Sequence, residues 1–252
     1  MNNDGLQDKV ALVTGAGRGI GFAIAETLGH RGAKIGINDL RPADSESAVI
    51  ALKREGITAI SLAGNVTTTT DANDIVNRIE KEFGRLDILV NNAGVLRPTR
   101  TEAISDEEWD FVINGNLKST FLCSRAAIPA LRRSRGGCII NMSSSAGKSV
   151  STIGGAHYTA AKAGVLGLTR HLARELAVEH IRVNAVCPGL IDTEMVRSTI
   201  PQATVEAYAA SFPALRLGLP REVADLVVFL ASDRASYITG ASCDINGGDL
   251  TI

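Results

Sequence analysis

The chain has 252 residues, and its 26 basic and 27 acidic side chains leave a net charge of −1 at pH 7. This balance argues against nucleic acid or an anionic membrane surface as the main partner, because both select for a basic patch. Apolar residues make up 45% of the chain, which is too many for a disordered protein. No apolar run reaches the roughly 20 residues that a membrane span needs.

The cysteines and the N-terminus narrow the class further. The four cysteines stand at positions 123, 138, 187 and 243, without a Cys-x-x-Cys pair. This spacing fits neither a zinc site nor a disulfide framework, so we expect no metal and free thiols in a reducing cytoplasm. The polar N-terminus carries Asp4 and Asp8 and does not have the pattern of a signal peptide. Because no linker or repeat divides the chain, we expect one domain over residues 1–252.

Short apolar runs alternate with helical patterns along the first half of the chain. Residues 9–13 form a continuous apolar run, which is typical of a strand buried on both faces. The same reasoning predicts strands at 33–38, 58–62 and 86–90, and helices at 20–29, 43–54 and 71–83, the last of them capped by Asp71.

The second half repeats this alternation. Its predicted elements are a long helical region at 106–133, a strand at 138–142, a helix at 158–178, a strand at 181–186, a helix at 221–231 and a strand at 241–245. Strands separated by helices predict an α/β fold, a doubly wound parallel sheet with helices on both faces. Residues 190–219 contain no clear strand, and we expect them to form a long loop over the substrate.

A glycine-rich turn follows the first strand and opens the first helix. Gly15, Gly19 and Gly21 form a G-x-x-x-G-x-G pattern, which differs from G-x-G-x-x-G. Unpaired N–H groups at a helix N-terminus attract a pyrophosphate, and glycines let it approach closely. A tight turn without a ligand would need similar residues, but the strand–turn–helix context favours a nucleotide site that also includes Arg18 and Ile20.

Asp39 ends the second predicted strand, where an acidic residue would meet the ribose of adenosine. A carboxylate there accepts hydrogen bonds from both ribose hydroxyls and repels a 2′-phosphate, which favours NAD over NADP. Arg18 and Arg41 lie nearby in the sequence and could instead hold a phosphate, so NADP stays open as the alternative.

Tyr158 and Lys162 stand four residues apart in a predicted helix and therefore share one face. An unperturbed tyrosine has a pKa of about 10, so acting as a base near neutrality requires a shift of about three units, or roughly 4 kcal/mol. A lysine ammonium about 4 Å away supplies roughly that much at an effective dielectric near 20. Taken alone, such a pair is more often a solvent-facing one.

Together these motifs resemble the short-chain dehydrogenase/reductases over about residues 7–250. The matching segments are Thr14-Gly15-x-x-x-Gly19-x-Gly21, Asn91-Asn92-Ala93-Gly94, the segment around Asn116, the serines at 143–145, Tyr158-x-x-x-Lys162 and Pro188-Gly189. The resemblance implies a Rossmann-like fold and hydride transfer between a nicotinamide cofactor and a secondary alcohol or ketone. It also implies a homotetramer built through the two long helices, here 106–133 and 158–178, and the last strand.

The resemblance also implies roles for individual residues. Tyr158 would be the general acid/base, and Lys162 would lower its pKa and bind the nicotinamide ribose. A serine would hydrogen-bond the substrate carbonyl; alignment of the preceding strand selects Ser144, whereas counting back from the tyrosine selects Ser145. Asn116 would complete a water-linked proton relay.

The remaining cofactor contacts carry over by position. Asn65 stands where the family often has aspartate, and its carbonyl oxygen would bond the adenine amino group. The full implied set is Asn65 and Val66 beside the adenine, Asn92, Ala93 and Gly94 along the adenine ribose, and Pro188, Gly189, Ile191 and Thr193 around the nicotinamide.

We therefore expect an NAD(H)-dependent enzyme that acts on a small polyol, a sugar acid or another hydroxy compound. The alternative is a reductase of 3-oxoacyl thioesters carried by acyl carrier protein or coenzyme A, favoured only by the basic cluster Arg132, Arg133 and Arg135. A more remote alternative, a non-catalytic NAD-binding regulator, would be expected to lack Tyr158 or Lys162.

Overall fold

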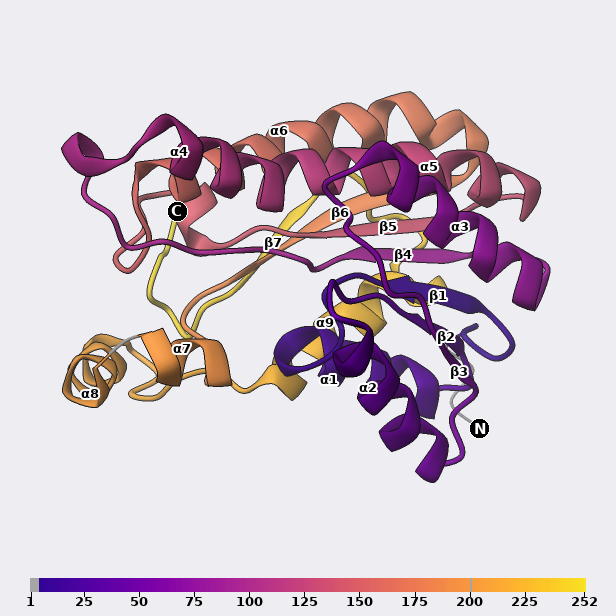
Figure 1. The fold of residues 1–252 in the computed structure, drawn as a ribbon, viewed down its shortest axis with the longest axis horizontal. Coiled ribbons are helices and arrows are strands. Elements are labelled where there is room, and N and C mark those ends of the chain that lie inside the picture. The colour runs from indigo at the N-terminus through magenta and orange to yellow at the C-terminus, as the bar shows by residue number, and fades with distance from the viewer. Residues whose placement is uncertain (1–4, 200) are drawn as a thin grey trace.

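The computed structural model describes residues 5–199 and 201–252. Residues 1–4 and 200, which the predicted domain 1–252 and the predicted loop 190–219 include, lie outside the described residues. A seven-stranded sheet forms the centre, in the order β3-β2-β1-β4-β5-β6-β7 with all neighbours parallel (Figure 1). The predicted doubly wound, Rossmann-like parallel sheet is confirmed.

The strands correspond closely to the predicted apolar runs. They are β1 Val10–Val13, β2 Lys34–Ile37, β3 Ala59–Ser61, β4 Ile88–Asn91, β5 Gly137–Met142, β6 Ile181–Pro188 and β7 Ser242–Ile245. Alternate residues of one strand face opposite layers. In β1, Ala11 and Val13 join one hydrophobic cluster, and Val10 and Leu12 join the other.

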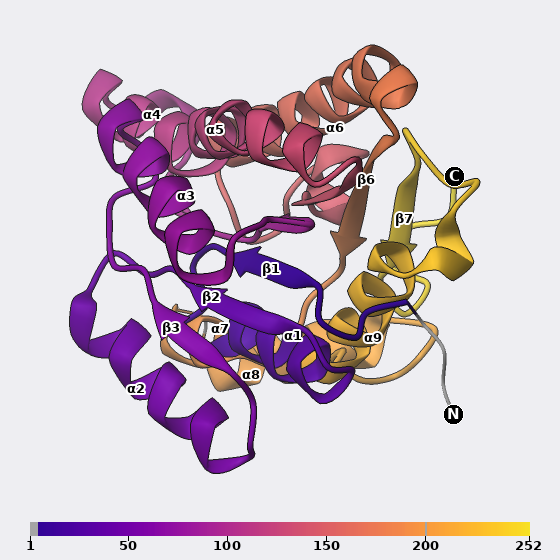
Figure 2. The ribbon, with the colours of Figure 1, turned by 90° about the vertical axis from the view of Figure 1, so that its right-hand side faces the viewer.

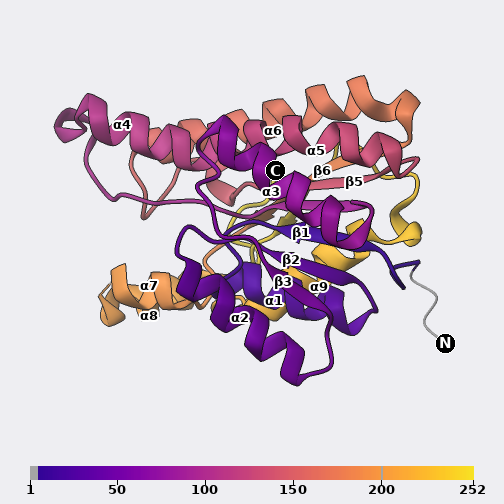
Figure 3. The same cartoon turned by 45° about the vertical axis from the view of Figure 1, so that its right-hand side comes forward.

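Helices cover both faces of the sheet, as Figures 2 and 3 show. One layer contains α1 Gly19–His30, α2 Pro42–Arg54 and α9 Pro220–Ala231, and the other contains α3 Thr69–Phe83, α4 Asp106–Ile113, α5 Ser119–Arg133 and α6 Ala156–Leu176. Among the described helices, none combines the length and apolar character needed to cross a membrane.

The predicted cap of α3 is wrong. Thr68 occupies the N-cap position, and its hydroxyl oxygen accepts the backbone N–H of Asp71 at 3.2 Å. The Asp71 carboxylate instead accepts the backbone N–H of Asn65 at 2.7 Å. Both residues are good caps, and Thr68 takes the position because the helix begins at Thr69, two residues earlier than predicted.

The long helical region at 106–133 is interrupted by a π-helical turn at Asn114–Lys118. The side chain of Asn116 donates to the carbonyl of Val112, four residues back, at 2.8 Å. This bond competes with the backbone for a carbonyl of the helical ladder, and π turns of this kind are frequent at functional sites. The interruption places Asn116 in a backbone conformation that the hydrophobic pattern did not predict.

The segment predicted as a loop at 190–219 contains two helices, α7 Glu194–Thr199 and α8 Gln202–Ser211. An isolated bridge between Ile191 and Gly218 closes its base. Pro201 suggested a break in structure, but it directly precedes α8, and proline is well tolerated at the start of a helix.

Candidate functional site

The predicted site residues gather at the carboxyl edge of the sheet. Gly15, Asp39, Asn92 and Ser144 come shortly after β1, β2, β4 and β5, and Pro188 ends β6. Because parallel strands end at the same edge, these residues from distant parts of the sequence face a common region. The helices α7 and α8 lie at the same edge, on the left in Figure 1.

The glycine loop is shaped to receive an anionic group. Gly15 and Gly19 have φ angles of +59° and +60°, which favour glycine. A Cβ atom on Gly15 would lie 2.8 Å from the Cα of Ala93, whereas one on Gly19 would meet only the Thr193 methyl at 3.9 Å. No described side chain caps α1, so its first N–H groups are available. These donors and the open space at Gly19 fit a pyrophosphate.

Thr14 and Asn92 hold this loop in place. The Thr14 hydroxyl oxygen accepts the backbone N–H groups of Asn92 at 3.0 Å and Ala93 at 3.1 Å. The Asn92 amide nitrogen donates to the carbonyls of Thr14 and Gly15, both at 3.0 Å. The sequence analysis did not assign Thr14 a role. Its position directly before Gly15 could have indicated that it supports the glycine loop. Asn92 therefore shapes the cofactor loop through its side chain.

Asp39 supports the loop from the neighbouring strand. Its Oδ2 accepts the backbone N–H of Gly17 at 3.1 Å, and a Cβ on Gly17 would lie 2.8 Å from that oxygen. The two arginines considered as phosphate ligands have carboxylate partners: Arg41 Nη2 lies 2.5 Å from Asp44, and Arg18 Nη1 lies 3.4 Å from Glu194. The carboxylate of Asp39 thus lies beside the glycine loop, while each of these arginines pairs with another carboxylate.

The predicted adenine contact of Asn65 stays a prediction. Its carbonyl oxygen already accepts the backbone N–H of Thr67 at 3.0 Å and the Thr67 hydroxyl at 2.8 Å. A carbonyl oxygen has two lone pairs, so the expected bond to the adenine amino group would have to displace one of these donors. Val66 is buried and packs in the cluster beside α3.

Tyr158, Ser144 and Lys162 come together between β5 and α6. The Ser144 side chain lowers the pKa of the Tyr158 phenol through hydrogen bonding, and its oxygen accepts the backbone N–H of Ala146 at 3.1 Å. The neighbouring serines have other partners, since Ser143 donates to the carbonyl of Lys162 at 2.9 Å and Ser145 begins a 3-10 turn. Of the two serines left open by the sequence, Ser144 is the one in contact with Tyr158.

Lys162 is buried, but it does not bond the phenol. Its Nζ donates to the carbonyl of Met142 at 2.9 Å and lies 5.6 Å from the centre of the Tyr158 ring. Burial lowers the pKa of Lys162 to about 8. Burial also raises the pKa of Tyr158, against a smaller lowering effect of the Ser144 hydrogen bond. The predicted lowering of the tyrosine pKa by a lysine about 4 Å away is therefore not seen in this state.

Asn116 carries an unusual buried acceptor. Its amide nitrogen donates to the carbonyls of Val95 and Val112, both at 2.8 Å, while its Oδ1 is buried without a hydrogen-bond partner among the described residues. A Cβ on Gly94 would lie 2.8 Å from that oxygen and 3.6 Å from the Lys162 Nζ. Buried carbonyl oxygens are normally paired, so this one is suited to accept from a water beside the lysine.

The remaining predicted cofactor residues lie where β6 enters the 190–219 segment. Gly189 donates its backbone N–H to Ile245 at 3.0 Å, and a Cβ on it would lie 2.9 Å from the Cα of Asn246. The Thr193 hydroxyl accepts the backbone N–H of Val196 at 3.3 Å, at the start of α7. Since the Thr193 methyl faces Gly19, this segment reaches the glycine loop.

Comparison with known proteins identifies the family. A sequence profile described as enoyl-(acyl carrier protein) reductase matches residues 15–249. The chain belongs to the short-chain dehydrogenase/reductase family. It is therefore an oxidoreductase that acts on CH–OH or keto groups with a nicotinamide cofactor, and the resemblance seen in the sequence is confirmed.

Several relatives of this dehydrogenase/reductase are similar over almost their full length. The chain is 44% identical to the 3-oxoacyl-(acyl-carrier-protein) reductase FabG of Escherichia coli (strain K12) over 249 residues, 98% of each chain. It is 41% identical to FabG of Staphylococcus aureus (strain Mu50) over 241 residues, 95% of this chain and 97% of the relative. A crystal structure of 3-oxoacyl-(acyl-carrier protein) reductase from Brucella melitensis matches with a TM-score of 0.91 and 37% identity, covering 97% of this chain and 92% of that one.

Three loops of this dehydrogenase/reductase meet near Tyr158. Gly155, in the loop before α6, donates its backbone N–H to the carbonyl of Arg97 at 2.8 Å. In the same loop, the Thr152 hydroxyl is hydrogen-bonded to the Tyr208 hydroxyl of α8. The segments 95–100, 149–157 and 190–219 are thus joined to one another by hydrogen bonds.

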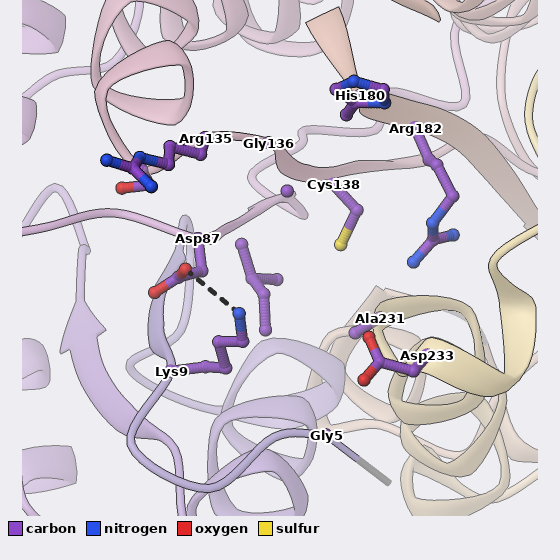
Figure 4. Close-up of a pocket in the computed structure, with 13 residues that line it drawn as sticks. Gly5, Lys9, Asp87, Arg135, Gly136, Cys138, His180, Arg182, Ala231 and Asp233 are labelled. Carbon is purple, nitrogen blue, oxygen red and sulfur yellow. Dashed lines mark ion pairs between the residues drawn. The ribbon is translucent and has the colours of Figure 1, made fainter.

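A separate hollow of about 190 Å³ lies at the opposite edge of the sheet (Figure 4). Lys9 and Asp87, which form an ion pair at 3.5 Å, lie within it just before β1 and β4. The helices α5 and α9 end at this edge, and helix C-termini carry partial negative charge that disfavours an anionic cofactor. The hollow is therefore distinct from the site around Tyr158.

Proposed function

We propose that this enzyme reduces the keto group of a 3-oxoacyl thioester to a 3-hydroxyacyl thioester. The observation that carries the proposal is the similarity, over 98% of the chain, to a protein named 3-oxoacyl-(acyl-carrier-protein) reductase. The comparisons give no support to the polyol or sugar acid that the sequence first suggested. Both Tyr158 and Lys162 are present and converge with Ser144, which argues against a non-catalytic regulator.

The hydroxyls of Ser144 and Tyr158 are proposed to bind the same substrate oxygen. Because Ser144 is the serine that influences the pKa of the Tyr158 phenol, we place one acceptor oxygen between the two hydroxyls, where it can receive a hydrogen bond from each. The nicotinamide, when bound, supplies the hydride to the carbonyl carbon. Tyr158 then donates its proton to the oxygen that gains negative charge, and Ser144 stabilises that charge.

A protonated Tyr158 is what the reductive direction requires, because the reduction of a ketone needs a proton donor. A phenol is protonated at neutral pH even at its ordinary pKa of about 10, and burial raises the pKa of Tyr158 further. After each turnover, Lys162 and a water on the free Oδ1 of Asn116 are proposed to return a proton to Tyr158. A pKa of about 8 makes Lys162 suited to exchange protons near neutrality.

The cofactor is proposed to be NAD(H). Gly15, Gly19 and Gly21 would hold the pyrophosphate, while Asp39 would accept from the adenosine ribose. The pairing of Arg18 with Glu194 and of Arg41 with Asp44 supports this choice, because among the described residues it leaves the Asp39 carboxylate without an arginine partner that would offset its repulsion of a 2′-phosphate. Pro188, Gly189, Ile191 and Thr193 would surround the nicotinamide beneath the 190–219 segment, which we assign to the substrate side.

The basic cluster does not support docking of a carrier protein at this site. Arg132 is bound to Glu179, with Nη2 2.7 Å from Oε1, and Arg133 is bound to Glu80 at 2.6 Å. Both arginines precede β5 and so lie at the amino edge of the sheet, away from Tyr158. The thioester proposal therefore rests on the comparisons and on the geometry at Ser144, and it covers carrier-bound and coenzyme A thioesters alike.

The proposal places the enzyme in the cytoplasm as a homotetramer. All four cysteines are free thiols, which suits a reducing compartment. Trp109, Phe111 and Phe121 of α4 and α5 are 42%, 45% and 42% exposed, and large exposed aromatics favour contact with another copy.

The decisive assay compares substrate classes directly. Purified enzyme with NADH is mixed with acetoacetyl-coenzyme A or acetoacetyl carrier protein, and the loss of NADH absorbance is followed. The reverse reaction is measured with NAD and a panel of polyols and sugar acids. Turnover of the thioesters supports the proposal, while turnover of polyols alone overturns it.

A further inference from the structure

The side chain of His157, directly before Tyr158, is fully buried between the first turns of α4 and α6. Its Nδ1 accepts the backbone N–H of Tyr158 at 2.9 Å, a donor shared with the carbonyl of Gly155 at 3.0 Å. Its Nε2 lies 2.9 Å from the Oε1 of Glu108. The imidazole thus connects the backbone of Tyr158 to a carboxylate on another helix.

These two bonds define the tautomer of His157. A ring nitrogen that accepts a hydrogen bond carries no proton, so Nδ1 is unprotonated. The proton of the neutral ring then lies on Nε2 and is donated to Glu108. Protonation of Nδ1 would set two N–H groups against each other, so the arrangement favours one orientation of the ring.

Glu108 ties this histidine to the substrate side of the site. Hydrogen bonding from Thr99 and from His157 lowers the pKa of its carboxyl group. Next to this contact, a Cβ on Gly155 would lie 2.5 Å from the carbonyl oxygen of Thr99 and 2.8 Å from the His157 ring. The loop 95–100, the start of α4 and the start of α6 are therefore locked together.

The first turn of α6 needs such support. Its N-cap residue, Gly155, has no side chain to accept the free N–H groups of the helix. His157 supplies an acceptor for the backbone of Tyr158, and through it Glu108 restrains the residue whose hydroxyl meets Ser144. A displacement of about 1 Å of a reacting group can cost about 100-fold in rate.

We propose that Glu108 and His157 are positioning residues. They hold the backbone of Tyr158 in the position that brings its hydroxyl close to Ser144 and to the substrate oxygen. This inference rests on the proposed reduction at Tyr158, because both residues act through the placement of that side chain.

The test compares variants that keep or remove the acceptor for Nε2. Glu108→Gln retains an oxygen that accepts from His157, whereas Glu108→Ala removes it. The matched control is Glu175→Ala, which breaks the exposed pair between His171 and Glu175 on the same helix, 3.2 Å apart. We measure kcat with acetoacetyl-coenzyme A, the Kd of NADH by fluorescence, and the melting temperature.

We expect kcat of Glu108→Ala to fall about ten- to 100-fold, with the Kd of NADH changed less than about two-fold because the glycine loop is untouched. Glu108→Gln and Glu175→Ala should keep kcat within about two-fold of the wild type. A melting temperature that falls in Glu108→Ala while kcat stays within two-fold would show a purely structural role and overturn the inference.

Nitrogen NMR of the histidine rings gives a readout independent of turnover. The signal of His157, assigned by its loss in His157→Asn, should show a proton on Nε2 and none on Nδ1. A ring protonated at Nδ1 would also overturn the inference. If the wild-type enzyme turns over no 3-oxoacyl thioester at all, the proposed function fails first, whereas a normal wild type with an unaffected Glu108→Ala rejects only the positioning role.

Discussion

Lys162 follows Tyr158 by one helical turn, yet its ammonium donates to the carbonyl of Met142 at 2.9 Å and lies 5.6 Å from the centre of the phenol ring. The lysine is therefore buried beside the tyrosine without a direct bond to its hydroxyl. Burial disfavours the charged form of both side chains, which lowers the pKa of the lysine and raises that of the tyrosine. The site holds a protonated phenol and a lysine that gives up its proton readily.

The buried charge of Lys162 is expected to lower the free energy of unfolding. Its pKa falls from 10.5 to about 8 on folding, so between these values the unfolded chain binds more protons and stability rises with pH. Below about pH 8 the full penalty applies, with an upper limit of about 3 kcal/mol. Lys162→Met should therefore raise the free energy of unfolding at pH 7 by about 1–3 kcal/mol while abolishing turnover.

Urea denaturation at about pH 7 and about pH 10 checks this prediction. The wild type should gain stability relative to Lys162→Met as the pH rises. The control is Lys53→Met, on the exposed face of α2, which should leave that difference unchanged. A Lys162→Met protein that is less stable than the wild type at pH 7 would show that the ammonium stabilises the fold.

Ser144 and Ser145 differ in their relation to Tyr158, because only Ser144 influences the pKa of the phenol. Ser144→Ala removes both a hydroxyl that lowers the pKa of the phenol and a proposed donor to the substrate oxygen, so kcat should fall about 100-fold or more. Ser145→Ala should change kcat less than about three-fold, because Ser145 only begins the following turn. Steady-state kinetics of the two variants decide the matter, and the opposite ranking would move the role to Ser145.

Asp39 is expected to set the choice between NAD and NADP. Asp39→Asn keeps an oxygen for the backbone N–H of Gly17 but removes the charge, so it should improve binding of NADP while weakening NAD about ten-fold. Asp39→Ala should weaken NAD further, since the support of the loop is lost as well. The ratio of kcat/KM for NADH and NADPH is the measurement, and an unchanged ratio in both variants would place the ribose elsewhere.

Much of this architecture follows from local patterns in the sequence. The continuous apolar run at 9–13 and the glycines after it predicted β1 and the start of α1, because a buried parallel strand and a tight turn each have a direct chemical signature. Gly15 and Asp39 could be placed at one edge of the sheet from strand order alone.

Other features depend on contacts that no local pattern encodes. The π turn at Asn116 arises from a side-chain bond to Val112, and the partner of Lys162 is a carbonyl of β5. The positions of α7 and α8 depend on packing over the loops, because α8 has only a weakly amphipathic pattern. The role of His157 becomes visible only when Glu108, 49 residues away, is brought against it.

The central claim is that Tyr158 protonates the oxygen of a 3-oxoacyl thioester, and the most direct test compares Tyr158→Phe with the wild type. NADH consumption with acetoacetyl-coenzyme A and NADH binding are measured side by side. We predict that the wild type turns over and that Tyr158→Phe loses at least about 100-fold in kcat while binding NADH normally. A Tyr158→Phe enzyme that reduces the thioester at the wild-type rate would contradict the account.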